Sequence, residues 1–180
     1  KFFPGWFCRF YYDKSVPEII INKLKELDNT ELVFIEKESG GKIYKDNGTF
    51  GSLWRFLVCI DPNVDMFLVC DTDSRLNLYL KKCMDMVNNE KNFIRFVDLP
   101  SFYPIAAGGF GGLKNSIKFK KEDFEKYTHG NFYCDQDFLK NEIFPQLGNN
   151  LITVPRTKIK NQTLNLIFKD LFITNITGNF

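Results

Sequence analysis

The sequence contains little of what many metal-binding and catalytic families rely on. Only one of its 180 residues is histidine, and no two of its five cysteines form a Cys-X-X-Cys pair. Both facts argue against a zinc site of ordinary spacing and against a histidine-based hydrolase. No apolar run reaches the roughly 18 residues that a membrane-spanning helix needs. The formal net charge of +2 is too small to indicate a nucleic acid or a membrane surface as partner.

The cysteines are odd in number, and most of them lie within apolar runs. They are Cys8, Cys59, Cys70, Cys83 and Cys134. We interpret them as buried thiols in a reducing compartment, which predicts a cytoplasmic protein.

The length and the composition predict one packed domain over residues 1–180. The chain is 44% hydrophobic and 26% charged, which is ordinary for a globular core. It opens on Lys1 without Met, so we expect that the domain lacks its first residues, and we leave open that it belongs to a longer chain. The many Phe, Lys and Asn residues suggest the AT-rich genome of a virus or a protist.

Strand and helix patterns alternate along the chain. We expect strands at residues 7–13, 31–37, 65–70, 92–97 and 151–154, and helices starting after a Ser15 cap and at residues 52–60, 76–89 and 134–147. The glycine-rich residues 104–114 are not expected to be regular. This alternation predicts an α/β fold with a mostly parallel sheet flanked by helices on both faces. In such sheets ligands bind outside the carboxyl ends of the strands.

Two acids one residue apart follow the most apolar predicted strand, at residues 65–70. Asp71 and Asp73 lie at its carboxyl end, and an extended chain would point both side chains the same way. Two such carboxylates form a site for Mg²⁺ or Mn²⁺, whose open positions phosphate oxygens can fill. In the alternative interpretation Asp71 caps the helix that begins near Leu76, and Asp73 is a solvated turn residue.

The segments around this acid pair resemble GT-A glycosyltransferases, enzymes that use nucleotide sugars and carry an Asp-X-Asp motif after a buried strand. More narrowly, they resemble small bacterial and viral glycosyltransferase-like domains. The resemblance implies a GT-A-like, Rossmann-like fold. The matching segments run in order over about residues 4–145: Pro4-Gly5-Trp6, Cys8-Arg9-Phe10-Tyr11, Ser15-Val16-Pro17, Trp54-Arg55-Phe56, Asp71 to Leu76, Pro104-Ile105 with Gly108, Gly109 and Gly112, and Asp135-Gln136 through Pro145.

Two departures from the family pattern matter. The first strand and the nucleotide-binding turn of the family precede the Pro4-Gly5-Trp6 segment, and they are absent from this sequence. The family also uses a late histidine as a metal ligand, and no histidine follows His129. Either the metal has only Asp71 and Asp73 with diphosphate and water, or dependence on metal is weak.

The resemblance also implies roles around the donor. Arg55 would approach the diphosphate or the first Asp of the pair, with a structural ion pair as the alternative. Thr72 lies between the acids, and Arg75 would approach phosphate or brace the acid pair. Gly108 and Gly109 would lie beside donor sugar and acceptor, with a tight structural turn as the alternative.

The Asp135-Gln136 pair also occurs in retaining family 8 glycosyltransferases. By that resemblance Asp135 would hold donor sugar hydroxyls and Gln136 would face the anomeric carbon, which implies retention of configuration. The alternative is that Asp135 caps its helix, where the positive end of the helix dipole lies.

Together these features predict a hexosyl- or deoxyhexosyltransferase. It would move a sugar from a nucleoside diphosphate donor, UDP by expectation, to a glycan or glycoprotein acceptor such as a viral glycoprotein. Mn²⁺ or Mg²⁺ at Asp71 and Asp73 would assist. The alternative from another class is a non-catalytic nucleotide-sugar or partner-binding domain of the same fold. A metal-dependent phosphotransferase would need a nucleophilic acid and a phosphate loop, and neither is evident in the sequence.

Overall fold

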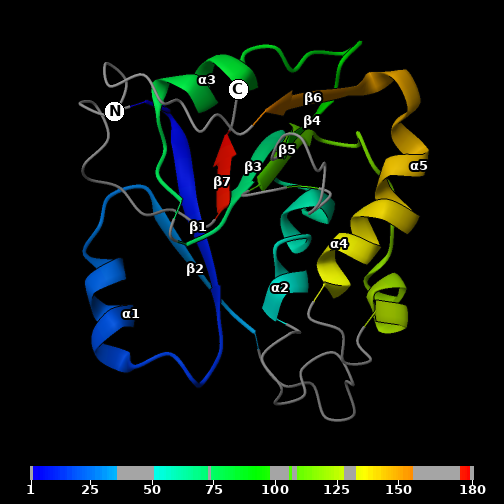
Figure 1. The fold of residues 1–180 in the computed structure, drawn as a ribbon. Coiled ribbons are helices and arrows are strands. Elements are labelled where there is room, and N and C mark those ends of the chain that lie inside the picture. Colours follow the sequence, from blue (N-terminus) through cyan, green and yellow to red (C-terminus); the bar gives the residue numbers. More distant parts are fainter. Residues whose placement is uncertain are drawn as a thin grey trace.

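The computed structural model describes residues 2–35, 51–72, 74–97, 106, 109–127, 133–155 and 175–178. Its centre is a seven-stranded sheet of order β2-β1-β7-β3-β5-β4-β6 (Figure 1). The strands are β1 (Trp6–Tyr12), β2 (Thr30–Phe34), β3 (Met66–Cys70), β4 (Phe93–Val97), β5 (Gly109–Leu113), β6 (Leu151–Pro155) and β7 (Asn175–Gly178).

The helical segments are short. They are α1 (Glu18–Lys25), α2 (Gly51–Trp54), η2 (Leu57–Ile60), α3 (Leu78–Met84), η3 (Lys121–Tyr127), α4 (Cys134–Phe138), the π-helical η4 (Leu139–Ile143), α5 (Phe144–Leu147) and η5 (Gly148–Asn150). Among the residues placed in the structure, no helix has the length and apolar character to cross a membrane.

The sheet is mixed, so the α/β class is confirmed but the mostly parallel sheet is wrong. Only β1 with β2 and β4 with β6 pair in parallel. Strand β5 runs antiparallel to β3 and β4, and β7 runs antiparallel to β1 and β3. Strand β3 is central, as predicted, but it is antiparallel to both neighbours. The error has a clear origin, because β5 and β7 are the two strands that the sequence patterns did not predict.

Strand β5 lies in the segment that was expected to be irregular, and its glycines fit against β3. A Cβ atom on Gly109 would lie 2.2 Å from the Val69 carbonyl oxygen. A Cβ on Gly111 would lie 2.7 Å from the Phe67 carbonyl oxygen and 2.8 Å from Met84 Sδ. Glycine has low strand propensity, so only the fit against the neighbouring strand and helix makes this segment a strand.

The core has two halves, one on each face of the sheet. Phe67 and Val69 of β3 belong to the first, which packs against α2 and α4, while Leu68 and Cys70 belong to the second, which packs against α3. Side chains of a strand alternate between faces, so a strand covered on both faces is buried throughout. This explains why all five residues of β3 are buried.

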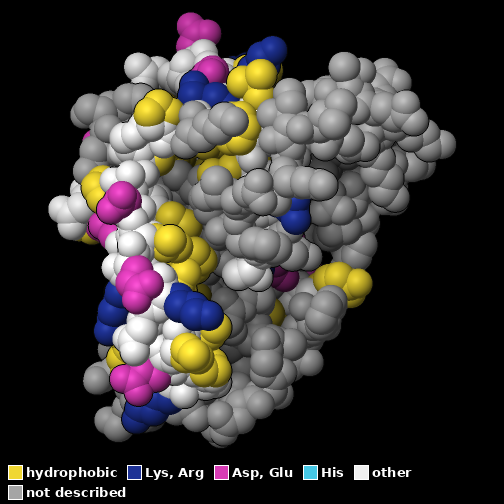
Figure 2. Space-filling view, turned by 90° about the vertical axis from the view of Figure 1, so that its left-hand side faces the viewer, with side chains coloured by type: hydrophobic (Ala, Val, Ile, Leu, Met, Phe, Trp, Pro, Cys, Tyr) yellow, Lys and Arg dark blue, Asp and Glu magenta, His cyan; other side chains and the backbone are white. Residues whose placement is uncertain are grey.

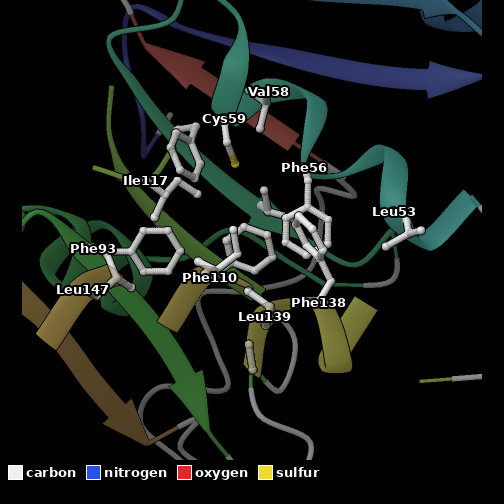
Figure 3. Packing of buried hydrophobic residues seen from close by; sticks show 14 of the residues in the cluster. Leu53, Phe56, Val58, Cys59, Phe93, Phe110, Ile117, Phe138, Leu139 and Leu147 are labelled. Atoms are coloured by element: carbon white, nitrogen blue, oxygen red, sulfur yellow. The ribbon is translucent and has the colours of Figure 1, made fainter. Parts of the chain in front are cut away.

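The first half of the core is aromatic (Figure 3). The ring of Phe56 stacks on Phe110 with centroids 5.1 Å apart and meets the edge of Phe138 at 4.8 Å. Such pairs add roughly 0.5–1.5 kcal/mol each beyond their buried area. All three rings are at most 1% exposed, so they fix the segments that carry them.

The predicted cap of the first helix is wrong. The predicted burial of the cysteines is confirmed for four of the five, and the reducing compartment stays a prediction. The amide and hydroxyl of Ser15 both donate to Asp13 Oδ1, and α1 begins after Pro17 without a side-chain cap. All five cysteines are free thiols; four of them are buried and Cys8 is half-buried.

Helix α1 covers the β2 edge of the sheet with only part of its apolar surface. Ile21 is buried, while Ile19 and Ile20 of the helix are exposed, as is Leu27 just after it. On this side of the molecule hydrophobic side chains are interspersed with charged ones (Figure 2). The exposed residues of α1 therefore belong to a mixed surface.

Candidate functional site

A cleft of about 350 Å³ lies at the carboxyl end of β3, where the sequence predicted a ligand site. Three consecutive residues that end or follow this strand, Cys70, Asp71 and Thr72, form part of its wall. The other described residues that line it are Tyr11, Gly51, Ser52, Trp54 and Arg55.

The Trp54-Arg55-Phe56 segment connects the aromatic core with this cleft. The single helix expected over residues 52–60 is wrong, because α2 ends at Trp54 and a separate 3₁₀-helix begins at Leu57. β-Branched side chains disfavour a longer α-helix, and short 3₁₀ turns are common where helices end. Phe56 is fully buried, whereas Trp54 and Arg55 line the cleft. The core thus fixes the backbone beside Arg55.

Arg55 brings together two acids that are far apart in the sequence. Its Nη1 donates to Asp71 Oδ1 at 3.1 Å and lies 3.6 Å from Asp135 Oδ2. The Arg55 side chain is 25% exposed, and those of Asp71 and Asp135 are 37% and 10% exposed. Arg55 thus contacts the first Asp of the pair, which fits both the role that the resemblance implies and the alternative of a structural ion pair. The carboxylate of the Asp135-Gln136 motif joins the same group.

Both capping alternatives are wrong. Helix α3 begins at Leu78, and the side chain of Asn77, not of Asp71, accepts a hydrogen bond from the Leu80 amide at 2.8 Å. Asp135 lies inside α4, whose N-cap is Tyr133 without a side-chain cap bond. Helix capping therefore does not explain why a carboxylate occurs at position 71 or at position 135.

Gln136 holds Asp135 in place. Its Oε1 accepts from the Ala106 amide at 2.9 Å, and its Nε2 donates to Asp135 Oδ2 at 3.1 Å. Both Asp135 and Gln136 are 7% exposed. The predicted positions of Asp135 at the donor sugar and of Gln136 at the anomeric carbon stay predictions. What the structure adds is that Gln136 orients the carboxylate that faces Arg55.

The cysteines near the site are protonated at neutral pH. Burial and the adjacent Asp71 raise the pKa of Cys70 to about 12. Burial also raises the pKa of Cys134, whose Sγ lies 3.3 Å from Ser52 Oγ. A nucleophilic or metal-binding cysteine acts as the thiolate, so these two thiols serve packing.

Of the remaining predicted site residues, Thr72, Arg75 and Gly109 lie within the described ranges. Thr72 lines the cleft, whereas Arg75 is exposed and is not among the described lining residues. Close packing of β5 against β3 explains why residue 109 is glycine, and a role of Gly109 toward a ligand stays a prediction. Asp73 and Gly108 lie outside the described residues.

The side chains of Asp71 and Asp135 are of a chemical type that binds divalent cations. Across the described ranges no group of three or more His, Cys, Asp or Glu side chains is placed to hold a metal ion. Asp71 and Asp135 nevertheless both face one cationic group, so their charges are directed at one position. Carboxylate oxygens are the ligands that Mg²⁺ and Mn²⁺ prefer, and both ions accept water or phosphate oxygens as further ligands.

Tyr11, Ser52 and Trp54 line the cleft, although the sequence analysis assigned them no role. No local pattern in the sequence indicates Tyr11, because its place in the cleft depends on β1 lying near the segment of Ser52 and Arg55 in the fold. Burial raises the pKa of Tyr11 to about 12, against the opposing effect of the neighbouring Arg9. The lining of the cleft thus includes a neutral phenol as well as the Arg55–Asp71 ion pair.

Comparison of the chain with protein-family models, with curated proteins and with solved structures finds no match. The support for a function therefore comes from the motifs and from the geometry of this chain.

Proposed function

We propose that the protein is a metal-assisted glycosyltransferase. It would take a sugar from a nucleoside diphosphate donor, UDP-linked by expectation, and transfer it to a glycan or glycoprotein. One observation carries the proposal: Arg55, Asp71 and Asp135 belong to three separate motifs of the resemblance, and one guanidinium brings them together. Arg55 and Asp71 line the cleft beside the carboxyl end of β3, and Asp135 lies behind them, 3.6 Å from Arg55 Nη1.

The chemistry needs positive charge where the leaving group forms. As the glycosidic bond breaks, negative charge grows on the diphosphate and the sugar acquires oxocarbenium character. Arg55 offers a cationic donor at the cleft wall, and Asp71 holds it there. A divalent cation held by Asp71, with Asp73 as its second predicted ligand, would supply Lewis-acid stabilisation of that diphosphate. Retention of configuration is part of the proposal and derives from the Asp135-Gln136 resemblance.

A non-catalytic nucleotide-sugar-binding domain is the second candidate, and one observation favours it. The amide oxygen and the amide nitrogen of Gln136 are both engaged, with Ala106 and with Asp135. A residue that the resemblance would place at the reacting centre is therefore held by the chain itself.

The test measures UDP-sugar hydrolysis and transfer with and without Mn²⁺. We expect Asp71→Asn and Asp73→Ala each to lower turnover about 100-fold, which is typical for removing one electrostatic contact to a developing charge. Asp85→Asn is the matched control, because Asp85 pairs with Lys81 on the surface of α3. UDP binding without turnover would favour the second candidate, and no UDP binding would exclude both. Inverted product by NMR would disprove retention alone.

A further inference from the structure

Arg55 is one cation shared by two carboxylates. Both contacts use the same nitrogen, Nη1, at 3.1 Å from Asp71 and 3.6 Å from Asp135. The three groups together carry one excess negative charge. The site can therefore accept additional positive charge, and Asp71 is the more exposed of the two acids.

The position of Arg55 lets its guanidinium move while its backbone stays fixed. The next residue, Phe56, is fully buried and packed between Phe110 and Phe138. Arg55 itself lines the cleft. An arginine offers five N–H donors, and a planar guanidinium can bind a carboxylate or a phosphate with two parallel bonds. Arg55 can thus exchange a carboxylate partner for a phosphate partner within the same cleft.

A divalent cation that arrives alone at Asp71 meets two obstacles. It competes with Arg55 for the same carboxylate oxygen, and it brings a second positive charge next to the guanidinium. A diphosphate removes both obstacles, because its oxygens give the guanidinium a new partner and leave Asp71 to the cation.

We propose that Arg55 couples the two ligands: it weakens the binding of a cation at Asp71 until a diphosphate is present. This inference rests on the proposed function and adds an order of binding to it. Coupling between two ligands is reciprocal, so the cation strengthens diphosphate binding by the same factor. We expect a factor of about 10, within the usual range for such coupling.

The experiment titrates Mn²⁺ and follows the free ion by electron paramagnetic resonance, with and without saturating UDP, after correction for Mn²⁺–UDP association in buffer. In the wild type, UDP is expected to lower the Mn²⁺ dissociation constant about tenfold. In Arg55→Gln, Mn²⁺ alone should bind several-fold more tightly than in the wild type. The effect of UDP should be several-fold smaller than in the wild type, because only direct ligation of Mn²⁺ by the diphosphate remains.

Two further variants support the comparison. Arg55→Lys keeps the positive charge but loses the planar guanidinium, so it should show a coupling between those of the wild type and Arg55→Gln. If circular dichroism shows that Arg55→Gln does not fold, Arg55→Lys replaces it in the comparison. Arg95→Gln removes an arginine that packs on Phe144, 4.8 Å from the ring centroid, and should behave as wild type.

The results separate the two proposals. If Arg55→Gln binds Mn²⁺ no more tightly than the wild type, or if UDP acts equally on both, the coupling role of Arg55 is disproved and the proposed function stands. If the folded wild type binds no UDP in the presence of Mn²⁺, both proposals are disproved.

Discussion

Two arginines in this molecule each face two acids, and the two arrangements differ. Arg9 uses separate nitrogens for its partners: Nε lies 2.6 Å from Glu31, and Nη1 lies 2.6 Å from Asp61. Its side chain is 10% exposed. Arg55 directs one nitrogen at two acids, at longer distances, and its side chain is 25% exposed beside a cleft.

The difference separates a structural contact from a candidate binding group. Arg9 joins β1, β2 and the end of η2 with short, distinct hydrogen bonds, as a group selected for stability would. Both clusters have the same formal charge, one cation with two carboxylates, so the difference lies in geometry. The longer contacts through one nitrogen of Arg55 gain less stability, and its exposure beside the cleft leaves its other donors available to a ligand. The same residue types thus serve two purposes, and the geometry of the shared nitrogen distinguishes them.

The largest expected effect is on stability when Arg9 is removed. Arg9→Gln leaves Glu31 and Asp61 without their cation, and we expect it to lower the free energy of unfolding by about 3 kcal/mol. Arg55→Gln should lower it less, by about 1 kcal/mol, because Arg55 is itself more exposed than Arg9 and its contacts of 3.1 and 3.6 Å are longer. Urea unfolding measures both. If both variants lose the same free energy of unfolding, Arg9 and Arg55 do not differ in their contribution to stability.

A smaller effect is expected from Gln136→Met, which keeps the size of the side chain but removes its polar groups. The buried amide of Ala106 and the carboxylate of Asp135 would each lose a hydrogen bond, so we expect a loss of about 2 kcal/mol. Gln146→Met is the control, because Gln146 and its partners are exposed to water. A loss at position 136 no larger than at position 146 would show that Asp135 does not depend on Gln136.

The smallest effect is the pH dependence of the Arg9 cluster. Burial opposes ionisation of Asp61, but the Asn63 amide and Arg9 outweigh it, so the pKa of Asp61 lies below its ordinary value of 3.8. The folded state thus favours the carboxylate. The resulting stability is present above about pH 4 and is lost as the pH falls through the folded pKa. We expect a loss below about 1 kcal/mol between pH 6 and pH 3.

Urea unfolding of the wild type and of Arg9→Gln at both pH values isolates this contribution. The variant should lose less stability on acidification, because its Asp61 lacks the cation that favours the charged form. If acid affects both proteins equally, Arg9 does not set the ionisation of Asp61.

The sequence predicted the elements whose signals are local. The apolar run of β3 is long enough to be buried on both faces, and the polar residues after it mark its end, so both the strand and the position of Asp71 were predictable. Asn77 was a recognisable cap three residues before Leu80, although the prediction placed the start of this helix at Leu76.

The rest depended on contacts between distant segments. Strand β5 consists largely of glycine, and its strand form follows from its fit against β3. Strand β7 pairs with β1 and β3, which precede it by more than 100 residues. The meeting of Arg55 with Asp135 joins positions 80 residues apart, and no periodicity in the sequence encodes it. Mixed strand direction follows from these long-range pairings.

The glycines of β5 also affect how the results of a mutational scan of this protein should be interpreted. Alanine at 109 or 111 would collide with the β3 backbone, so we expect these positions to tolerate substitution poorly for a steric reason. Intolerance there would indicate crowding between neighbouring strands and would carry no information on the proposed chemistry. Expression at a lower temperature should partly restore the folding of such steric variants.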